Sequence, residues 1–281
     1  MQFSKWHGQG NDFVIVNGFQ EKLNDYRQAA IAVCDRHFGI GADGLVILLP
    51  AATADADFKI RIFNSDGSEA EMCGNATRCI ARYVYENGLT EKTSLTLETL
   101  AGYIKPEIVF EAGQIKTICV DMGEPRLQRS EIPMAGPDDL QAVNIPLEAA
   151  GGTYGITCVS MGNPHCVIFV DDITAVDLSA IGPVIETHPL FPRKTNVEFV
   201  QVLSSDKVRM RVWERGAGVT LACGTGASAT LVASVLNRKT DRAITVKLDG
   251  GDLFVEWRED NHIYMSGPAI EVFRGSYLGR L

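Results

Sequence analysis

The sequence predicts an α+β protein made of two related, β-rich domains. Each domain is expected to be a curved, mostly antiparallel sheet or barrel around one central helix. Two observations support this prediction: short β-rich runs separated by Gly-containing turns dominate the chain, and several segments recur in the same order about 150 residues apart. A chain of 281 residues with 46% hydrophobic residues is long enough to bury two cores.

The internal repeat is clearest around two cysteines that begin similar turns. Cys73 and Cys223 are each followed by glycine, and the segments that lead into the two turns also match. Segments repeated in one order indicate two copies of one structural unit. The matching pairs are Met72-Cys73-Gly74-Asn75 with Ala222-Cys223-Gly224-Thr225, Arg61-Ile62-Phe63-Asn64 with Arg211-Val212-Trp213-Glu214, Gly10-Asn11 with Gly162-Asn163, and Gly44-Leu45 with Asn196-Val197.

Local patterns place strands and helices within each half. Helical periodicity is expected over 25–38, 75–87 and 225–237, with Gly88 as a C-terminal cap. The last helix has no charged residue before Arg238 and should be buried on all sides, whereas Arg78, Arg82 and Glu86 should leave its counterpart less enclosed. The expected strands are 13–16, 45–49, 58–63, 94–98, 115–120, 157–160, 166–170, 197–202, 208–213, 244–248 and 253–257.

The two halves are expected to join near residues 121–125, where Gly and Pro interrupt the pattern. This divides the chain into 1–122, which carries Cys73, and 123–267, which carries Cys223. The C-terminal segment 268–281 should pack back on the first domain. The stretch 131–139 contains proline and acidic residues and is expected to be an exposed connection.

Composition excludes several classes of function. The net charge is −9 and no basic cluster is present, which argues against a nucleic-acid partner. The first residues do not resemble a signal peptide, and the longest apolar run is far too short for a membrane span. Seven cysteines without a compact framework favour thiols in a reducing compartment. These features predict a cytoplasmic protein without a membrane association.

The duplicated thiols indicate a specific chemistry. Each cysteine is expected at the amino end of a helix, where unpaired N–H groups and the helix dipole should lower the pKa of the thiol. Inverting a carbon that carries hydrogen requires removal of a proton from one face and delivery to the other. Two opposed thiols could perform both steps, and the helix ends could bind a substrate carboxylate. We therefore expect Cys73 and Cys223 to lie on opposite sides of a cleft between the domains.

The motifs around these residues resemble the diaminopimelate epimerase family over essentially the whole chain. The resemblance implies a cofactor-independent epimerase that uses neither pyridoxal phosphate nor a metal. It further implies interconversion of LL- and meso-diaminopimelate for lysine and peptidoglycan precursors, in an enzyme that is commonly a homodimer. The motifs are Gly8-Gln9-Gly10-Asn11-Asp12-Phe13, Phe63-Asn64-Ser65-Asp66-Gly67-Ser68-Glu69, Glu71-Met72-Cys73-Gly74-Asn75-Ala76-Thr77-Arg78-Cys79, Gly162-Asn163-Pro164-His165, Thr195-Asn196-Val197-Glu198, and Trp213-Glu214-Arg215-Gly216 leading to Ala222-Cys223-Gly224-Thr225-Gly226.

The same resemblance implies roles for individual residues. Cys73 and Cys223 would be the acid/base pair, with His165 and Glu214 as catalytic neighbours. Many family members have Gln where this chain has Gly44, so any contact made by that side chain is replaced here. The residues implied in substrate binding are Asn11, Asn64, Gly74, Asn75, Asn163, Asn196, Glu214, Arg215, Gly224 and Thr225.

Plainer interpretations apply to the other cysteines and histidines. The spacing of Cys73 and Cys79 lacks a close CxxC or His pair, which argues against zinc. The remaining cysteines are expected to be small core residues, and the remaining histidines to be structural. These residues are Cys34, Cys79, Cys119, Cys158, Cys166, His7, His37, His188 and His262.

Two other functions remain open at this point. A proline or hydroxyproline racemase would share the paired turns, but it typically has Met-Cys-Gly-His and Ser-Pro-Cys-Gly at these places. Asn75 and Ala222 oppose that assignment. A non-enzymatic redox sensor could instead join Cys73 and Cys223 in a disulfide across a closing cleft.

Overall fold

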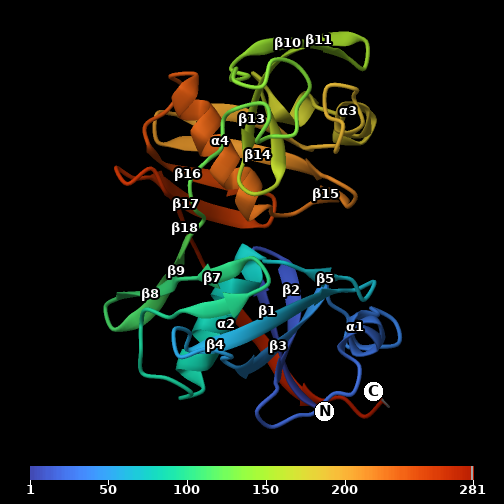
Figure 1. Cartoon of the computed structure of the whole chain (residues 1–281), viewed down its shortest axis with the longest axis vertical. Coiled ribbons are helices and arrows are strands. Elements are labelled where there is room, and N and C mark those ends of the chain that lie inside the picture. The colour runs from blue at the N-terminus through green and yellow to red at the C-terminus, as the bar shows by residue number, and fades with distance from the viewer. Residues whose placement is uncertain (280) are drawn as a thin grey trace. The chain divides into compact units, whose positions relative to one another are not determined.

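The computed structural model describes residues 1–279 and 281, and the chain forms two compact units (Figure 1). Unit 1 contains Met1–Asp121 and Ser266–Leu281, and unit 2 contains Met122–Met265. Both units are sheet-rich and mostly antiparallel, as the sequence predicts. Among the described strands the pairing in each unit follows an open path, so the curved sheet is observed rather than the barrel.

Unit 1 contains a sheet in the order β19-β1-β2-β3-β4-β6-β7, with β5 paired to β4, and a separate pairing of β8 with β9. Helix α2 lies against β1, β2, β8 and β9, and α1 lies against β3 and β4. The elements are β1 (Gln2–Gly8), β2 (Asn11–Asn17), α1 (Tyr26–Cys34), β3 (Gly44–Pro50), β4 (Phe58–Asn64), β5 (Glu69–Ala70), α2 (Gly74–Glu86), β6 (Leu97–Thr99), β7 (Gly102–Ile104), β8 (Pro106–Glu111), β9 (Gln114–Asp121) and β19 (Ile270–Ser276).

Unit 2 has the strand order β10-β11-β12-β13-β14-β16-β17-β18, with β15 paired to β14. Helix α4 contacts the strands β11, β12, β13, β14, β16 and β17, so the sheet surrounds it. The elements are β10 (Ile145–Ala149), β11 (Gly152–Ser160), β12 (Pro164–Phe169), the 3₁₀ turn η1 (Ile173–Ala175), α3 (Leu178–Glu186), β13 (Asn196–Ser204), β14 (Lys207–Glu214), β15 (Gly218–Thr220), α4 (Gly224–Leu236), β16 (Ala243–Leu248), β17 (Gly251–Trp257) and β18 (Ile263–Gly267).

The sequence repeat reappears in the strand registers. In unit 1, β2 and β3 are parallel and joined through α1, with Phe13 opposite Gly44. In unit 2, β12 and β13 are parallel and joined through α3, with His165 opposite Asn196. A parallel pair requires a crossover connection, and a helix supplies it in both places. The two units therefore share one topology as well as one set of motifs.

The central helices differ in how their polar residues are accommodated. Every residue of α4 from Gly226 to Ser234 is buried, which confirms the prediction from its sequence. Helix α2 is more enclosed than predicted, because Arg78 has no exposure to solvent. Its guanidinium donates to the side chains of Gln9 and Asn75 and to the backbone oxygen of Pro268. These partners replace the water that an arginine ordinarily needs.

The stretch 131–139 also departs from its prediction. Ile132 and Met134 are 0% and 4% exposed and belong to the hydrophobic core of unit 2. The segment is therefore only partly an exposed connection, because Ile132 and Met134 pack inward while Glu131 and residues 135–139 are exposed. Within the described residues, no helix has the length and apolar character needed to cross a membrane.

Candidate active site

Cys73 begins helix α2, as its turn predicts. Its backbone is extended, with φ −146° and ψ 116°, and it occupies the N-cap position. The Cys73 carbonyl accepts from the Thr77 N–H at 2.9 Å, which starts the helical bonding. Its half-buried thiol donates to Asn11 Oδ1, with the sulfur 3.7 Å away. Cys73 therefore contacts Asn11, the first residue of β2.

Two hydrogen-bonded side-chain amides, Asn11 and Asn75, lead to this thiol. Asn75 Nδ2 donates to Asn11 Oδ1 at 2.9 Å, and Asn11 Nδ2 donates to Asp43 Oδ2 at 2.8 Å. Arg78 donates to Asn75 Oδ1 at 2.7 Å. Burial lowers the pKa of Arg78 to about 10, so the guanidinium remains charged at neutral pH. The amides of Asn11 and Asn75 therefore have fixed orientations beside Cys73.

Asn64 is the last residue of β4. Its Nδ2 donates to Ser68 Oγ at 2.9 Å, and Gly44 lies directly opposite it in the register of β3 and β4. A Cβ at Gly44 would lie 2.8 Å from the backbone oxygen of Phe63, so this backbone approach requires glycine. The Asn64 side chain is thus held by Ser68, and a side chain at position 44 would require the Phe63 carbonyl in β4 to shift.

Cys223 begins helix α4 in unit 2 with a similar extended backbone. Its sulfur accepts from the Gly226 N–H at 3.3 Å and lies 3.5 Å from Thr225 Oγ1. The side chain is more enclosed than that of Cys73, because the residue is only 6% exposed. Gly74 and Gly224 are the first residues of their helices, one residue before the predicted starts.

A line of polar side chains extends from Cys223 into the core of unit 2. Asn163 Nδ2 donates to Thr225 Oγ1 at 3.3 Å, and Asn163 Oδ1 lies 3.0 Å from His165 Nε2. His165 Nδ1 lies 2.6 Å from Glu198 Oε1, and both of these side chains are fully buried. His165 is therefore connected to Cys223 through Asn163 and Thr225.

Glu214, Arg215 and Asn196 lie near the ends of β13 and β14. Thr220 donates to Glu214 Oε1. The Arg215 backbone N–H donates to Asn196 Oδ1 at 2.9 Å, and Asn196 Nδ2 donates to the Pro164 carbonyl at 2.8 Å. Asn196 therefore fixes the backbone of Arg215 against the start of β12.

The electrostatics at Cys223 correct one expectation. Burial raises the pKa of Cys223 well above its ordinary value, and the nearby carboxylates of Glu214 and Glu198 raise it further. Hydrogen bonds from Thr225 and from the Gly226 N–H lower this pKa, but they are outweighed. The prediction of a lowered thiol pKa was therefore wrong at this cysteine. Burial also raises the pKa of Glu214, while hydrogen bonds from Thr220 and Cys223 act in the opposite direction.

Three residues of these networks were missed as site residues in the sequence analysis. Arg78 and Glu198 stand in recognised motifs but were given no role, and Asp43 was not considered. A charged residue inside an apolar run, as Glu198 is in β13, was the available signal. The five cysteines expected in the core are all buried, in agreement with their prediction: Cys34, Cys79, Cys119, Cys158 and Cys166.

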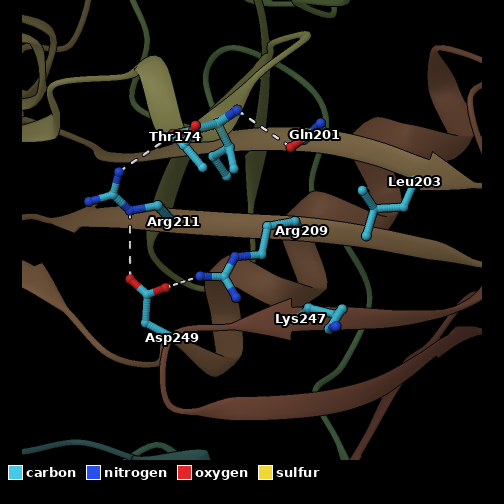
Figure 2. Close-up of a pocket in the computed structure, with 8 residues that line it drawn as sticks. Thr174, Gln201, Leu203, Arg209, Arg211, Lys247 and Asp249 are labelled. Atoms are coloured by element: carbon cyan, nitrogen blue, oxygen red, sulfur yellow. Dashed lines mark hydrogen bonds and ion pairs between the residues drawn. The ribbon is translucent and has the colours of Figure 1, made fainter.

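A surface groove of about 490 Å³ lies elsewhere on unit 2 (Figure 2). Arg209 and Arg211 of β14 line it and both pair with Asp249. Met210, between them in the strand, instead accepts a hydrogen bond from Thr230 of α4. Since side chains alternate along a strand, the groove lies on the opposite face of β14 from α4. It contains none of the predicted site residues.

Comparison with known proteins identifies the family of this chain. A family model described as diaminopimelate epimerase matches residues 3–128 and 157–272. Diaminopimelate epimerase from Pelotomaculum thermopropionicum is 60% identical over 99% of this chain and 99% of that protein. The same-named protein from Heliobacterium modesticaldum is 57% identical over 98% of this chain and 99% of its own length.

Solved structures at low identity share the fold. A PhzF-family phenazine biosynthesis protein from Bacillus anthracis has a TM-score of 0.72 and 18% identity, with 99% of both chains covered. A hydroxyproline epimerase from Agrobacterium vitis has a TM-score of 0.67 and 16% identity, covering 98% of this chain and 91% of that one. Together with the full-length sequence matches, the two related units and their paired cysteine turns show that the chain belongs to the diaminopimelate epimerase family.

Proposed function

We propose that this protein is an isomerase that converts LL-2,6-diaminopimelate to meso-diaminopimelate by cofactor-independent proton transfer between Cys73 and Cys223. The observation that carries the proposal is that the same local structure occurs in both units: a cysteine followed by glycine begins the central helix of each unit. Relatives that share the whole length and bear the name diaminopimelate epimerase favour this substrate over proline.

In the proposed reaction one sulfur, as the thiolate, removes the α-proton from one face of the carbon. The other sulfur, as the thiol, delivers its proton to the opposite face, so the pair exchanges protonation states in each turnover. Backbone N–H groups at Gly74, Asn75, Gly224 and Thr225 would bind the reacting carboxylate. These donors would also stabilise the negative charge that develops as the proton leaves.

The high pKa of Cys223 has a consequence for this reaction. Burial and the carboxylates of Glu214 and Glu198 favour its thiol form. A substrate ammonium group placed near the sulfur would lower that pKa, because an adjacent positive charge stabilises the thiolate. Ionisation of Cys223 would then follow substrate binding, which keeps the nucleophilic form scarce in its absence.

The distal centre of diaminopimelate carries a second ammonium and a second carboxylate. Arg215 is suited to the carboxylate, and Glu214 with the asparagine amides is suited to the ammonium. The amides proposed for this role are Asn11, Asn64, Asn163 and Asn196. We further propose that neither a metal nor pyridoxal phosphate takes part, and that the enzyme acts in the cytoplasm without a nucleic-acid partner.

We also propose that the active species is a homodimer. Strand β19 ends the strand order of the unit 1 sheet, and it carries Val272 and Phe273 at 54% and 47% exposure. An apolar edge strand of this kind is suited to pairing with a second copy. Sedimentation equilibrium tests this proposal, with a monomer at micromolar concentration as the contrary result.

The test of the reaction uses LL-diaminopimelate in D₂O, followed by NMR. The expected result is formation of the meso isomer with deuterium at the inverted α-carbon, with no change on addition of a chelator. L-proline is the control substrate and should keep its α-proton. Absence of exchange into diaminopimelate by the reduced protein would reject the epimerase assignment, and exchange into proline would favour the racemase.

A further inference from the structure

A buried carboxylate lies behind the Cys223 turn and has no assigned role. Glu198 in β13 is fully buried, and its Oε1 lies 2.6 Å from His165 Nδ1. Its other oxygen, Oε2, is buried and makes no hydrogen bond to any residue that the structure describes. A half-satisfied buried carboxylate lowers stability, so its presence next to His165 points to a role in the site.

The hydrogen bonds of Asn163 define the protonation of His165. Asn163 Nδ2 donates to Thr225, so the amide oxygen is the atom that faces His165 Nε2 at 3.0 Å. An amide oxygen only accepts, and Nε2 therefore carries a hydrogen. A second proton lies between His165 Nδ1 and Glu198 Oε1, since one of these atoms must donate. The pair is net neutral whichever of the two atoms holds this proton.

The hydrogen bonds from Asn163 through Thr225 lead to the Cys223 sulfur, with each group donating to the next. Thr225 Oγ1 accepts from Asn163, which leaves its hydroxyl hydrogen available to Cys223 Sγ at 3.5 Å. A hydroxyl that donates to sulfur stabilises the thiolate. Gly226 leaves room for this arrangement, because a Cβ there would lie 2.9 Å from Glu198 Oε1 and 3.2 Å from Cys223 Sγ.

We propose that Glu198 is a positioning residue: it holds His165 with Nε2 protonated, which orients the Asn163 amide and so directs the Thr225 hydroxyl toward Cys223. The effect of this arrangement on catalysis rests on the proposed function. The hydrogen bonds themselves can be tested by the reactivity of the Cys223 thiol, without substrate. Within unit 2, the titratable groups that face the sulfur are Glu214 from β14 and Glu198 from β13. His165 from β12 contacts Glu198 through Nδ1.

The test measures alkylation of Cys223 by iodoacetamide at a fixed, mildly alkaline pH, with the modified peptide identified by mass spectrometry. A Cys73→Ser background removes the other predicted nucleophile. Thr225→Val keeps the side-chain shape but removes the hydroxyl, and it should slow alkylation about tenfold, since a hydrogen bond to a charged group is lost. Ser228→Ala is the matched control. Its hydroxyl donates to the Gly224 carbonyl at 3.0 Å, and its loss should leave the rate unchanged.

Two substitutions then separate positioning from packing. Glu198→Leu should slow alkylation relative to Glu198→Gln, because the Gln amide N–H can donate to His165 Nδ1 and the Leu side chain cannot. Both variants remove the carboxylate that raises the pKa of Cys223, so they are matched in charge and differ in the hydrogen bond to His165. The double variant Glu198→Leu/Thr225→Val should be no slower than Thr225→Val alone, because both changes break one chain.

Additive slowing in the double variant, or equal rates in Glu198→Leu and Glu198→Gln, would overturn the proposal. If Glu198→Leu does not fold, ¹⁵N NMR of the His165 ring in the unsubstituted protein decides instead. A protonated Nε2 supports the proposal, and an unprotonated Nε2 overturns it. These readouts do not use diaminopimelate, so failure of the epimerase assay would be recognised separately.

Discussion

Arg78 donates to Asn75 Oδ1 at 2.7 Å from a position with no exposure to solvent. This bond turns the Asn75 amide nitrogen toward Asn11 Oδ1, the same oxygen that accepts from Cys73. The guanidinium therefore orients the amides on which the first cysteine depends. Arg78 was expected to leave helix α2 less enclosed, together with Arg82 and Glu86. It is instead a buried charged side chain near the start of that helix.

Replacing Arg78 should lower both stability and activity. Arg78→Met removes the donor that this side chain supplies to Gln9 and Asn75, and a buried acceptor that loses its partner costs about 1–3 kcal/mol in the free energy of unfolding. Urea denaturation measures the change. Lys116→Met removes an exposed ion pair with Glu111 and should cost less than about 1 kcal/mol. Equal effects of the two variants would contradict the structural role of Arg78.

Each of the paired cysteines should be necessary for turnover. Cys73→Ala and Cys223→Ala should each lower kcat by about 10²–10⁴-fold, because one face of the carbon loses its acid or base. Cys34→Ala is the control, since burial raises the pKa of that core thiol to about 12. It should change the melting temperature more than kcat. Normal turnover in either site variant would refute the two-base assignment.

Glu214→Gln should stabilise the protein at neutral pH while reducing activity. Burial raises the pKa of Glu214 above its unfolded value, so the folded state binds the proton more tightly. Its contribution to stability is therefore present below the unfolded pKa and is lost as pH rises through the folded pKa. The gain in melting temperature from the substitution should appear near pH 7 and disappear below about pH 4. A gain that is independent of pH would show that ionisation of Glu214 is not the cause.

Gly182 in α3 packs against the indole of Trp213. A Cβ at Gly182 would lie 2.5 Å from Trp213 Cγ, so Gly182→Ala must displace the ring that precedes Glu214. Overpacking of this kind costs about 1–3 kcal/mol, measured by thermal or urea unfolding. Gly152→Ala meets its first neighbour at 3.5 Å and should be tolerated. If the two variants were equally stable, the close approach of α3 to β14 would be in doubt.

Arg215→Ala should weaken substrate binding more than folding. Its guanidinium donates to the Arg193 carbonyl at 3.2 Å near the surface, a contact of small energetic weight. A charged hydrogen bond to the distal carboxylate is worth about 1.5–3 kcal/mol, so KM should rise about tenfold or more. Lys207→Ala removes an equal charge from the exposed start of β14 and should leave KM unchanged. A large fall in melting temperature for Arg215→Ala would instead identify a structural residue.

Local patterns predicted much of the fold because they depend on neighbouring residues. The two cysteine turns and the buried helix α4 were found in this way, and α2 and α4 begin within one residue of their predicted starts. Helix α3 was missed because Gly182 and Pro183 interrupt its periodicity. The burial of Arg78 could not be predicted, because it depends on Pro268, which lies at the other end of the chain.

The return of the last residues to unit 1 affects the order in which the protein can assemble. Strand β19 pairs along β1, and Pro268 supplies a carbonyl to Arg78, so unit 1 needs both ends of the chain. Unit 2 is continuous and can fold as soon as its own segment has left the ribosome. The domain translated first is therefore the one completed last. Until β19 has been synthesised, the edge of β1 that pairs with it remains unpaired and open to pairing with other strands.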